Sequence, residues 1–419
     1  MTILAPDTAG QSPAGARALW ADGLWRAAMA ALALMPLGMA IAHRSSPVFA
    51  GLAALLALAA TAVEGRLGDL ARQARAALAS PLGLAVLAFL AWCLVSVGWS
   101  EFKALSASAL GEFWLPVLAA FVLGLTLPER MTRTAFWLLI AVSVLACATM
   151  IFELRTGLAL RRSLGMRWHS FIFNRPVLTL LCLLPAVVIW AMRGMRHGWI
   201  LALAFAALAF AAMAHSESGA SILGFAAGLV TFLAALAAPR LVARLAAVAF
   251  VVLTVAAPFL GQIADRAIPA GVHQRLADDH SRDRVDIWLS FGEAIRRQPL
   301  LGGGFGVSPR MRDTAVAERV PSKDETLLGV GHPHNTLVQV WAELGGVGAF
   351  LALAVILLLL RTIARQERLI AAASLALLGS ATAVALVGHG AWQGWWAASL
   401  GAAIVWILAA RRTERETGP

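Results

Sequence analysis

Twelve long apolar runs divide this 419-residue chain and limit it to one class of structure. A helix that crosses a bilayer needs about 20 predominantly apolar residues, because it must satisfy its backbone hydrogen bonds without help from water. Apolar residues make up 60% of the chain and charged residues only 14%, with a mean hydropathy of +0.77. We therefore predict an all-α polytopic membrane protein with twelve transmembrane helices. The predicted spans are 27–42, 48–63, 82–99, 113–127, 135–152, 176–192, 199–214, 220–238, 245–263, 347–360, 370–387 and 391–410.

The spacing of these runs predicts three parts. Residues 1–263 hold nine transmembrane helices, residues 264–336 form a long polar loop with amphipathic helices, and residues 337–419 hold the last three transmembrane helices. The first run is followed directly by a second and lacks a small-residue cleavage site, so we expect it to remain as a span.

Arginine in the short loops predicts the orientation of the chain. The loops after the second, fourth, sixth, eighth and tenth runs carry two or three arginines each, whereas the opposite short loops carry at most one Lys or Arg. The C-terminal segment is also basic, with Arg411, Arg412 and Arg415. We therefore expect both termini in the cytoplasm, where acidic lipid headgroups attract basic segments. The sequence contains no nucleic-acid-binding motif, so its positive net charge does not predict that partner.

Two outer segments break this charge pattern. Residues 153–175 carry five arginines, and the long loop 264–336 carries nine arginines and Lys323. Long loops cross a membrane whatever their charge, which explains the second segment better than the first. A polyanionic substrate handled on the outer face would account for both. Arg161, Arg167 and Arg175 are therefore candidate substrate-binding residues.

The stretch 331–348, GHPHNTLVQVWAELGGVG, places a histidine at the start of a predicted helix. Asn335 is a good N-cap, and the apolar spacing predicts a helix that ends where Gly345 and Gly346 break it. The helix dipole beside His334 favours the neutral ring that a general base requires. Asn335, Gln339 and Glu343 follow at four-residue steps and would give the helix a polar edge that could line a cavity. The alternative is that His334, beside a proline, is a surface or capping residue.

A second amphipathic helix is predicted from Ser281 to Gln298, before Pro299. Arg284 lies in its first turn, where backbone N–H groups and the helix dipole favour an anion such as phosphate. Ion pairing of this arginine with Asp283 or Asp286 on a solvated face is equally compatible with the spacing.

These two segments resemble the sequence signature of the O-antigen ligase and polymerase superfamily. The signature has a His-Asn pair, nine residues and Gly-x-x-Gly, here His334, Asn335, Gly345 and Gly348. The order Arg284, Trp288, a Gly-rich turn and then His-Asn is similar to the outer loop of that superfamily. Two shorter motifs extend the resemblance: Asn174-Arg175 before the sixth span, and the turn 215–220 between the seventh and eighth spans. The sequence departs from the pattern at this turn, where Gly219 stands in place of the usual arginine.

The resemblance implies a GT-C-like glycosyltransferase in the bacterial inner membrane, active at its periplasmic face. It implies a glycan donor linked to undecaprenyl pyrophosphate, lipid A-core as acceptor, and transfer with inversion of the anomeric carbon. His334 would act as base, and Arg284 and Arg175 would meet the charge on the leaving pyrophosphate. No metal and no cofactor is then required. The remaining candidate substrate-binding residues are Arg167, Arg161, Asn335, Ser216, Ser218, Gln339 and His332.

Two alternatives remain. An O-antigen or exopolysaccharide polymerase would share the fold and the donor but use a carrier-linked acceptor. The sequence motif around His334 favours the ligase. A lipid-linked glycan transporter or flippase would also suit twelve spans with both ends inside. Such proteins place ionisable residues within their spans, whereas the polar residues here gather in two outer segments, with Glu112 at the edge of one span. This distribution favours an enzyme.

Overall fold

The computed structural model describes residues 13–275 and 281–412, and every regular element in those ranges is a helix. Eleven segments there are long and apolar enough to cross a membrane, which confirms a polytopic membrane protein. The twelfth predicted span is helix α18, Gly394–Ala409, which is apolar but only 16 residues long. The other bundle helices are α1 Pro13–Ile41, α2 Ser46–Val63, α4 Pro81–Ser96, α5 Lys103–Thr126, α6 Arg133–Arg155, α8 Asn174–Gly194, α9 Gly198–His215, α10 Gly219–Ala237, α11 Pro239–Ala256, α16 Thr336–Ile363 and α17 Arg368–Val387.

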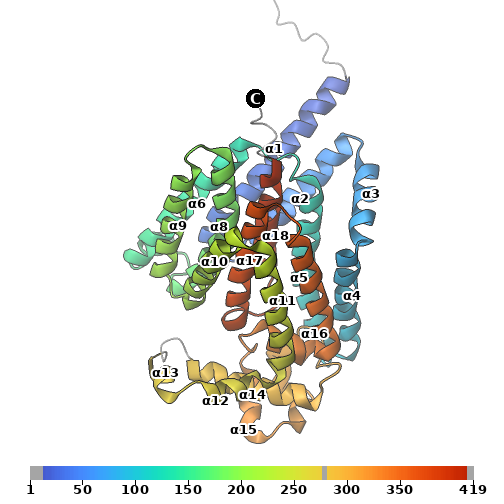
Figure 1. Ribbon diagram of the computed structural model, residues 1–419, viewed down its shortest axis with the longest axis vertical. Helices are drawn as coiled ribbons and strands as arrows, with labels where there is room; N and C mark the ends of the chain where they lie inside the picture. The colour runs from blue at the N-terminus through green and yellow to red at the C-terminus, as the bar shows by residue number, and fades with distance from the viewer. Residues whose placement is uncertain (1–12, 276–280, 413–419) are drawn as a thin grey trace, which may run out of the picture.

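The bundle has two distinct ends (Figure 1). Helix α1 begins and α18 ends at one of them, called here the terminal end. A layer of short helices crosses the opposite end, called here the loop end. The layer holds α12 Leu260–Ala267, α13 Ala270–Arg275, α14 Ser281–Arg297 and α15 Ser322–Glu325.

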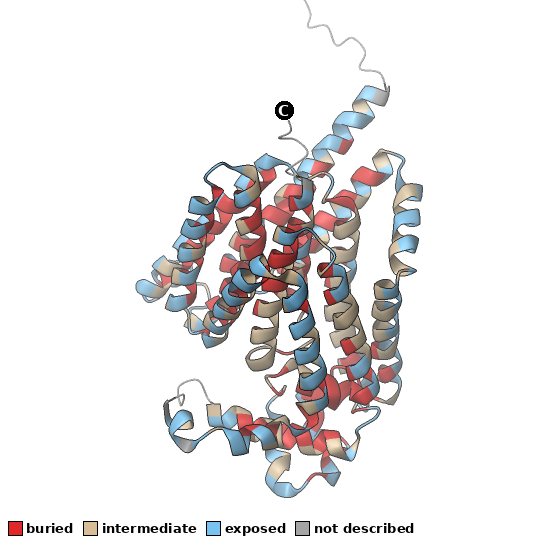
Figure 2. Cartoon of the chain, viewed as in Figure 1, coloured by how far each residue is buried: buried red, intermediate tan, exposed pale blue. Residues whose placement is uncertain are grey.

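The main core surrounds α18, which packs against α2, α5 and α8. Trp395 and Trp406 of this helix are among the largest fully buried side chains. Buried residues accordingly concentrate on the inner helices, while exposed residues lie on the outer faces of the bundle (Figure 2). A short helix can span the middle of this bundle because neighbouring helices, not lipid, cover its sides.

Some boundaries differ from those predicted. The ninth span was predicted to run to residue 263, but α11 ends at Ala256 and the chain turns through Pro258 into α12. Proline lacks the backbone N–H that would continue the helical ladder, which explains the earlier end. The loop after the second span also contains a helix that apolar runs did not predict, α3 Leu67–Leu78.

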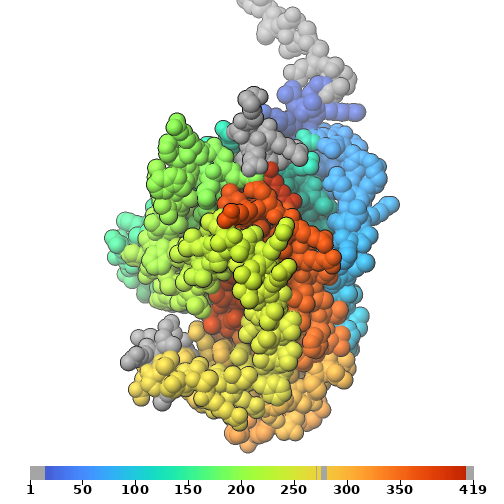
Figure 3. Space-filling view, viewed as in Figure 1, coloured from blue at the N-terminus to red at the C-terminus, as the bar shows by residue number. Residues whose placement is uncertain are grey.

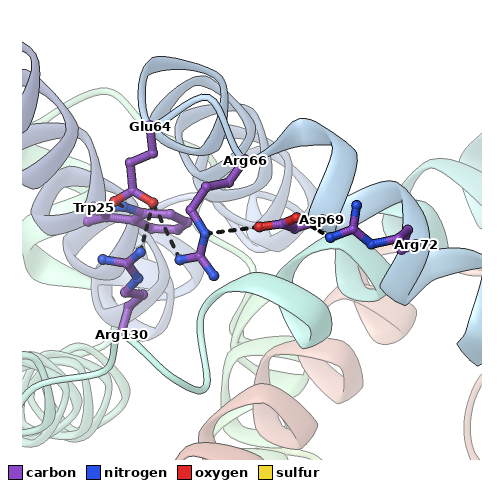
Figure 4. A network of polar contacts seen from close by, with 6 residues as sticks. All are labelled: Trp25, Glu64, Arg66, Asp69, Arg72 and Arg130. Carbon is purple, nitrogen blue, oxygen red and sulfur yellow. Dashed lines mark hydrogen bonds and ion pairs between the residues drawn. The ribbon is translucent and has the colours of Figure 1, made fainter.

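A polar network at the terminal end joins α1, α2, α3 and the link between α5 and α6 (Figure 4). The carboxylate of Glu64 accepts hydrogen bonds from Trp25 Nε1 at 2.8 Å and from Arg130 Nη2 at 2.7 Å. The guanidinium of Arg130 also lies 4.9 Å from the centre of the Trp25 ring. Arg66 lies between Glu64 and Asp69, at 3.7 and 3.6 Å. Arginines that the charge pattern assigns to orientation thus also fasten helices together.

Helix α16 is interrupted at Gly345, where the backbone has φ 65° and ψ −168°. The prediction that the helix breaks at Gly345 is confirmed, but the helix resumes and continues to Ile363. The break receives the loop that follows α14, because Gly346 N donates to Pro299 O at 2.7 Å and Gly304 N donates to Glu343 O at 2.8 Å. The loop end is therefore held to the bundle by backbone hydrogen bonds.

We expect Gly345→Ala to destabilise the protein by about 3 kcal/mol or more, because this φ/ψ region is essentially restricted to glycine. A β-carbon there would also lie 2.2 Å from Leu300 O, so the loop would have to move. The yield of monodisperse protein after heating in detergent measures the effect. Gly124→Ala is the control, since a β-carbon at that position in α5 meets nothing within 4 Å. Equal heat resistance of the two variants would contradict the assignment.

Candidate active site

Asn335 caps α16 as predicted. Its backbone is extended, and its side chain accepts a hydrogen bond from Val338 N at 3.1 Å. Its Nδ2 donates to Leu386 O at 3.0 Å, which joins the start of α16 to the end of α17. Both ends of this amide are occupied by backbone groups and the side chain is 1% exposed, so the structure supports a capping role rather than substrate binding.

His334 precedes this cap in a left-handed backbone conformation with φ 51°. Its Nδ1 lies 3.0 Å from Gly388 O, in the loop between α17 and α18. A carbonyl oxygen only accepts hydrogen bonds, so Nδ1 carries the proton in this arrangement and Nε2 carries the basic lone pair. His332 supports the backbone, because its Nδ1 accepts from His334 N at 3.2 Å, and the two rings lie 4.2 Å apart. The geometry sets the tautomer that a general base requires.

The α14 helix also holds the histidine segment in place. Trp288 Nε1 donates to the carbonyl of Pro333, the residue before His334, at 2.9 Å. Arg284 lies one turn earlier on the same face of α14 and is half-buried. Its neighbour Arg282, not Arg284, takes the ion pair with Asp286, at 2.6 Å. The structure therefore brings the helix that carries Arg284 against the segment that carries His334.

The predicted polar edge of α16 does not line a cavity. Glu343 is fully buried, and its carboxylate accepts hydrogen bonds from Gln339 Nε2 at 2.9 Å and Trp392 Nε1 at 2.6 Å. Backbone N–H groups of Gly306 and Ser308 complete its shell. Gln339 in turn accepts from Ala391 N at 2.8 Å. These side chains position residues 388–393, the loop whose carbonyl orients His334, and Gln339 contributes in this way rather than by facing substrate.

A basic cavity of about 640 Å³ opens at the loop end of the bundle. Three arginines line it and no carboxylate does, so it suits an anion. Arg175 and Arg167, predicted from the sequence, both lie in its wall. The space-filling view shows the molecule hollowed between the yellow helices of the loop layer and the bundle (Figure 3). The complete lining is His43, Arg44, Arg167, His169, Phe171, Ile172, Asn174, Arg175 and His389.

Arg175 is held by an aromatic partner in the bundle. Its guanidinium carbon lies 5.6 Å from the centre of the Trp395 ring, and Trp395 is almost completely buried. His389 packs edge-on against the same ring at 5.0 Å. Arg175 and His389 therefore share one rigid support, and His389 follows directly after the residue that binds His334. This places the basic cavity beside the candidate base.

Three histidines in or near the cavity, His43, His332 and His389, are held neutral. Burial, together with the charges of Arg175, His332 and His334, lowers the pKa of His389 from 6.5 to about 3. Burial and the neighbouring His334 lower the pKa of His332 to about 4. Burial and the nearby arginines, Arg175 first, lower the pKa of His43 to about 4. At neutral pH these three histidines therefore add no positive charge to the cavity, whereas its arginines do.

Three other predicted binding residues have structural partners. Arg161 is buried, donates to the carbonyls of Ala40 and Ile41 at 2.5 and 3.0 Å, and lies 4.8 Å from the Phe173 ring centre. It therefore closes the C-terminal end of α1 and is not among the residues that line the cavity. Ser216 Oγ donates to Met213 O at 2.7 Å, and Ser218 Oγ caps α10 by accepting from Ser221 N at 3.2 Å. Short polar residues at a turn favour such caps over ligand contacts.

The structure adds cavity residues that the sequence reasoning missed: His43, Arg44, His169, Asn174 and His389. Asn174 precedes Arg175 in the short motif that resembles the superfamily. Its Oδ1 is buried without a hydrogen-bond donor in the described part of the chain. His389 had a weaker signal, because it stands in a short polar interruption between the last two apolar runs. Arg44 was counted only as a loop charge that affects orientation.

Comparison with known proteins identifies one region. Residues 204–353 match a family model described as O-antigen ligase. Proteins named as candidate polysaccharide ligases from Rickettsia bellii, Rickettsia typhi and Rickettsia felis are 27%, 27% and 28% identical to this chain over 197 residues. Each match covers 46% of this chain and 46 or 47% of the relative, so just under half of each protein is aligned.

We expect the protein to lose stability as the pH falls from about 6.5 towards 4. Histidines in the unfolded chain take up protons near pH 6.5, whereas His332 and His389 stay neutral in the folded protein until about pH 4 and 3. Thermal unfolding in detergent at several pH values measures this loss. The double variant His332→Asn, His389→Asn should show a smaller loss over that range, and the exposed His197→Asn should match the unmodified protein. An unchanged pH dependence in the double variant would show that these two histidines do not cause it.

Proposed function

We propose that this chain, whose residues 204–353 match the family model described as O-antigen ligase, transfers a glycan from undecaprenyl pyrophosphate to lipid A-core. The observation that carries the proposal is the position of His334. Its ring is fixed through Nδ1 by Gly388 O, and the next residue, His389, lines a cavity whose wall holds three arginines and no carboxylate. A base next to a site for polyanions is what transfer from a pyrophosphate-linked donor requires.

In the proposed step, Nε2 of His334 takes the proton of an acceptor sugar hydroxyl as its oxygen attacks the anomeric carbon. The bond between that carbon and the donor phosphate oxygen breaks, and the electron pair leaves with undecaprenyl pyrophosphate. A single displacement of this kind inverts the anomeric centre. The charge that grows on the leaving group is stabilised by guanidinium groups, which bind phosphate oxygens in pairs.

We assign the donor phosphates to Arg175 and Arg167, with Arg44 as a further contact. The support is that all three line one cavity and that Arg175 is held rigidly on Trp395. Arg44 and Arg175 can also take the place of the family arginine that is missing at Gly219. Arg284 remains a candidate for the same charge because its helix binds the segment before His334. Arg161, Asn335, Gln339, Ser216 and Ser218 are assigned to support of the site.

An apolar cavity of about 260 Å³ suits the lipid part of the donor. It lies between α11, α16 and α17, and its wall includes Thr336 and Leu386. These residues flank the cap of α16: Thr336 follows Asn335, and the carbonyl of Leu386 binds its amide. An isoprenoid chain in this cavity would bring its pyrophosphate towards His334. Together with the arginines of the short loops, this supports our proposal that the loop end faces the periplasm and that the terminal end, where α1 begins and α18 ends, faces the cytoplasm.

Deletion of the gene tests the acceptor. If the protein is a ligase, cells that lack it should accumulate long carrier-linked glycans that fail to reach lipid A-core. If it is a polymerase, those cells should carry lipid A-core capped with single repeats. Purified protein in proteoliposomes tests the class of activity. Movement of lipid-linked glycan across the bilayer with no sugar transfer would replace the enzyme by a transporter.

We expect His334→Asn to lower the transfer rate by about 10²- to 10⁴-fold, which is the typical contribution of a general base. Asparagine is chosen because it tolerates the left-handed backbone at this position better than alanine does. Transfer from a lipid-linked donor by purified protein is the measurement, with size-exclusion profiles as a test of folding. His332→Asn should cost less, because His332 supports a backbone N–H. Near-normal transfer by folded His334→Asn would remove this residue as the base.

We expect Arg175→Lys to lower the turnover rate more than it weakens donor binding, because charge on the leaving group grows in the transition state. Lysine keeps the charge but not the paired N–H groups or the flat contact with Trp395. Arg284→Lys should behave in the same way if Arg284 meets the same phosphates. Arg312→Lys is the control, since that arginine lies 3.5 Å from Glu325 in the loop layer. Equal small losses in all three variants would indicate a diffuse basic surface.

A further inference from the structure

A second basic groove lies far from the candidate active site, where the start of α11 meets the end of α16. It has a volume of about 340 Å³, about ten times the roughly 30 Å³ that one water molecule occupies in the liquid. Four arginines stand around it, two from α11, one from α16 and one from the turn after α16, while alanine and leucine side chains form its floor. The lining is Arg240, Ala243, Arg244, Ala247, Leu357, Leu360, Arg361, Ala364 and Arg365.

We infer that this groove binds the headgroup of an anionic phospholipid with two phosphates, such as cardiolipin. The two helices are transmembrane segments, so their ends lie where lipid headgroups lie. An apolar floor beneath a basic rim fits a molecule with acyl chains below and phosphates above. Basic pockets between transmembrane helices at the cytoplasmic side are known to suit such headgroups.

The side chains of the four arginines have no partner within the described part of the chain: none forms an ion pair or donates a hydrogen bond there. Nearby arginines differ, since Arg193 binds Glu367, Arg368 binds Leu236 O and Arg411 binds Gln366. Like charges four residues apart on a helix repel each other, and Arg240 and Arg244 on α11 have this spacing. A ligand with negative charge would relieve that repulsion.

The helix dipole adds a second reason. Arg240 is the second residue of α11 and Arg244 follows one turn later. The N-terminal end of a helix carries partial positive charge, so cations there are unfavourable unless an anion is present. The rule that basic residues stay in the cytoplasm explains how many arginines lie at this end. It does not explain why four of them surround one groove without a carboxylate.

Two pairs of arginines point to two phosphates. Arg240 and Arg244 are neighbours on one face of α11, while Arg361 lies in the last turn of α16 and Arg365 in the turn that follows its end at Ile363. Each pair can hold one phosphate between its guanidinium groups. A lipid that carries both phosphates on one headgroup would join the two helices, which a lipid with a single phosphate cannot do. The inference is independent of the transfer reaction.

The test is lipid binding by the full-length purified protein, measured by native mass spectrometry during titration with cardiolipin or phosphatidylglycerol. We expect tighter binding of cardiolipin, and a roughly 10- to 30-fold loss of affinity when either Arg240→Gln with Arg244→Gln or Arg361→Gln with Arg365→Gln removes one pair. The control is Arg133→Gln with Arg196→Gln, which removes two exposed arginines from the same end outside the groove. Size-exclusion profiles confirm that each variant is folded.

Three results would overturn the inference. The first is equal affinity for the two lipids, which would remove the two-phosphate headgroup. The second is an equal loss in the control variant, which would mean that only net charge matters. The third is the absence of lipid binding by the unmodified protein.

Discussion

The buried carboxylate of Glu343 is the interaction on which the loop end depends. It accepts hydrogen bonds from Gln339 on its own helix, from Trp392 beyond α17, and from the backbone at Gly306 and Ser308. Three segments far apart in the sequence thus meet at one buried carboxyl group. A buried carboxyl group is costly unless donors surround it, so all three segments must be in place together. Because Trp392 and Gly388 belong to one short loop, the same group also fixes the carbonyl that orients His334.

The site is built from irregular backbone, and the membrane explains where that backbone can lie. A span exposed to lipid must satisfy its own hydrogen bonds, so turns and broken helices occur only where protein groups or water complete the bonding. The loop layer supplies those groups here, through the backbone bonds to Pro299 and Leu300 at the break in α16. The arginines of the basic cavity likewise lie in loops or at helix ends. The candidate catalytic and binding residues can therefore gather at the loop end, while the spans remain apolar.

The elements that sequence reasoning predicted well are those with a local cause. The N-cap at Asn335, the break at Gly345 and the amphipathic helix that became α14 each follow from a few neighbouring residues. The roles of polar side chains followed less well. Arg161, Gln339 and Glu343 have side chains typical of a binding site, but they form hydrogen bonds within the protein. Arg44 and His389 line the cavity although no sequence pattern predicted it. Which partner a polar group meets depends on distant segments.

The sequence by itself determined that the chain is a helical membrane protein, because apolar runs of this length have no other stable environment. It also determined that basic residues gather outside the spans, and it contains the His-Asn motif and the arginines near that motif. Only the tertiary structure decided which of those arginines share a cavity and which tautomer His334 adopts. Those features arise from contacts between residues up to hundreds of positions apart, such as Trp92 with Leu344 O at 3.0 Å. Local pattern contains no information about such contacts, since they exist only after the helices have packed.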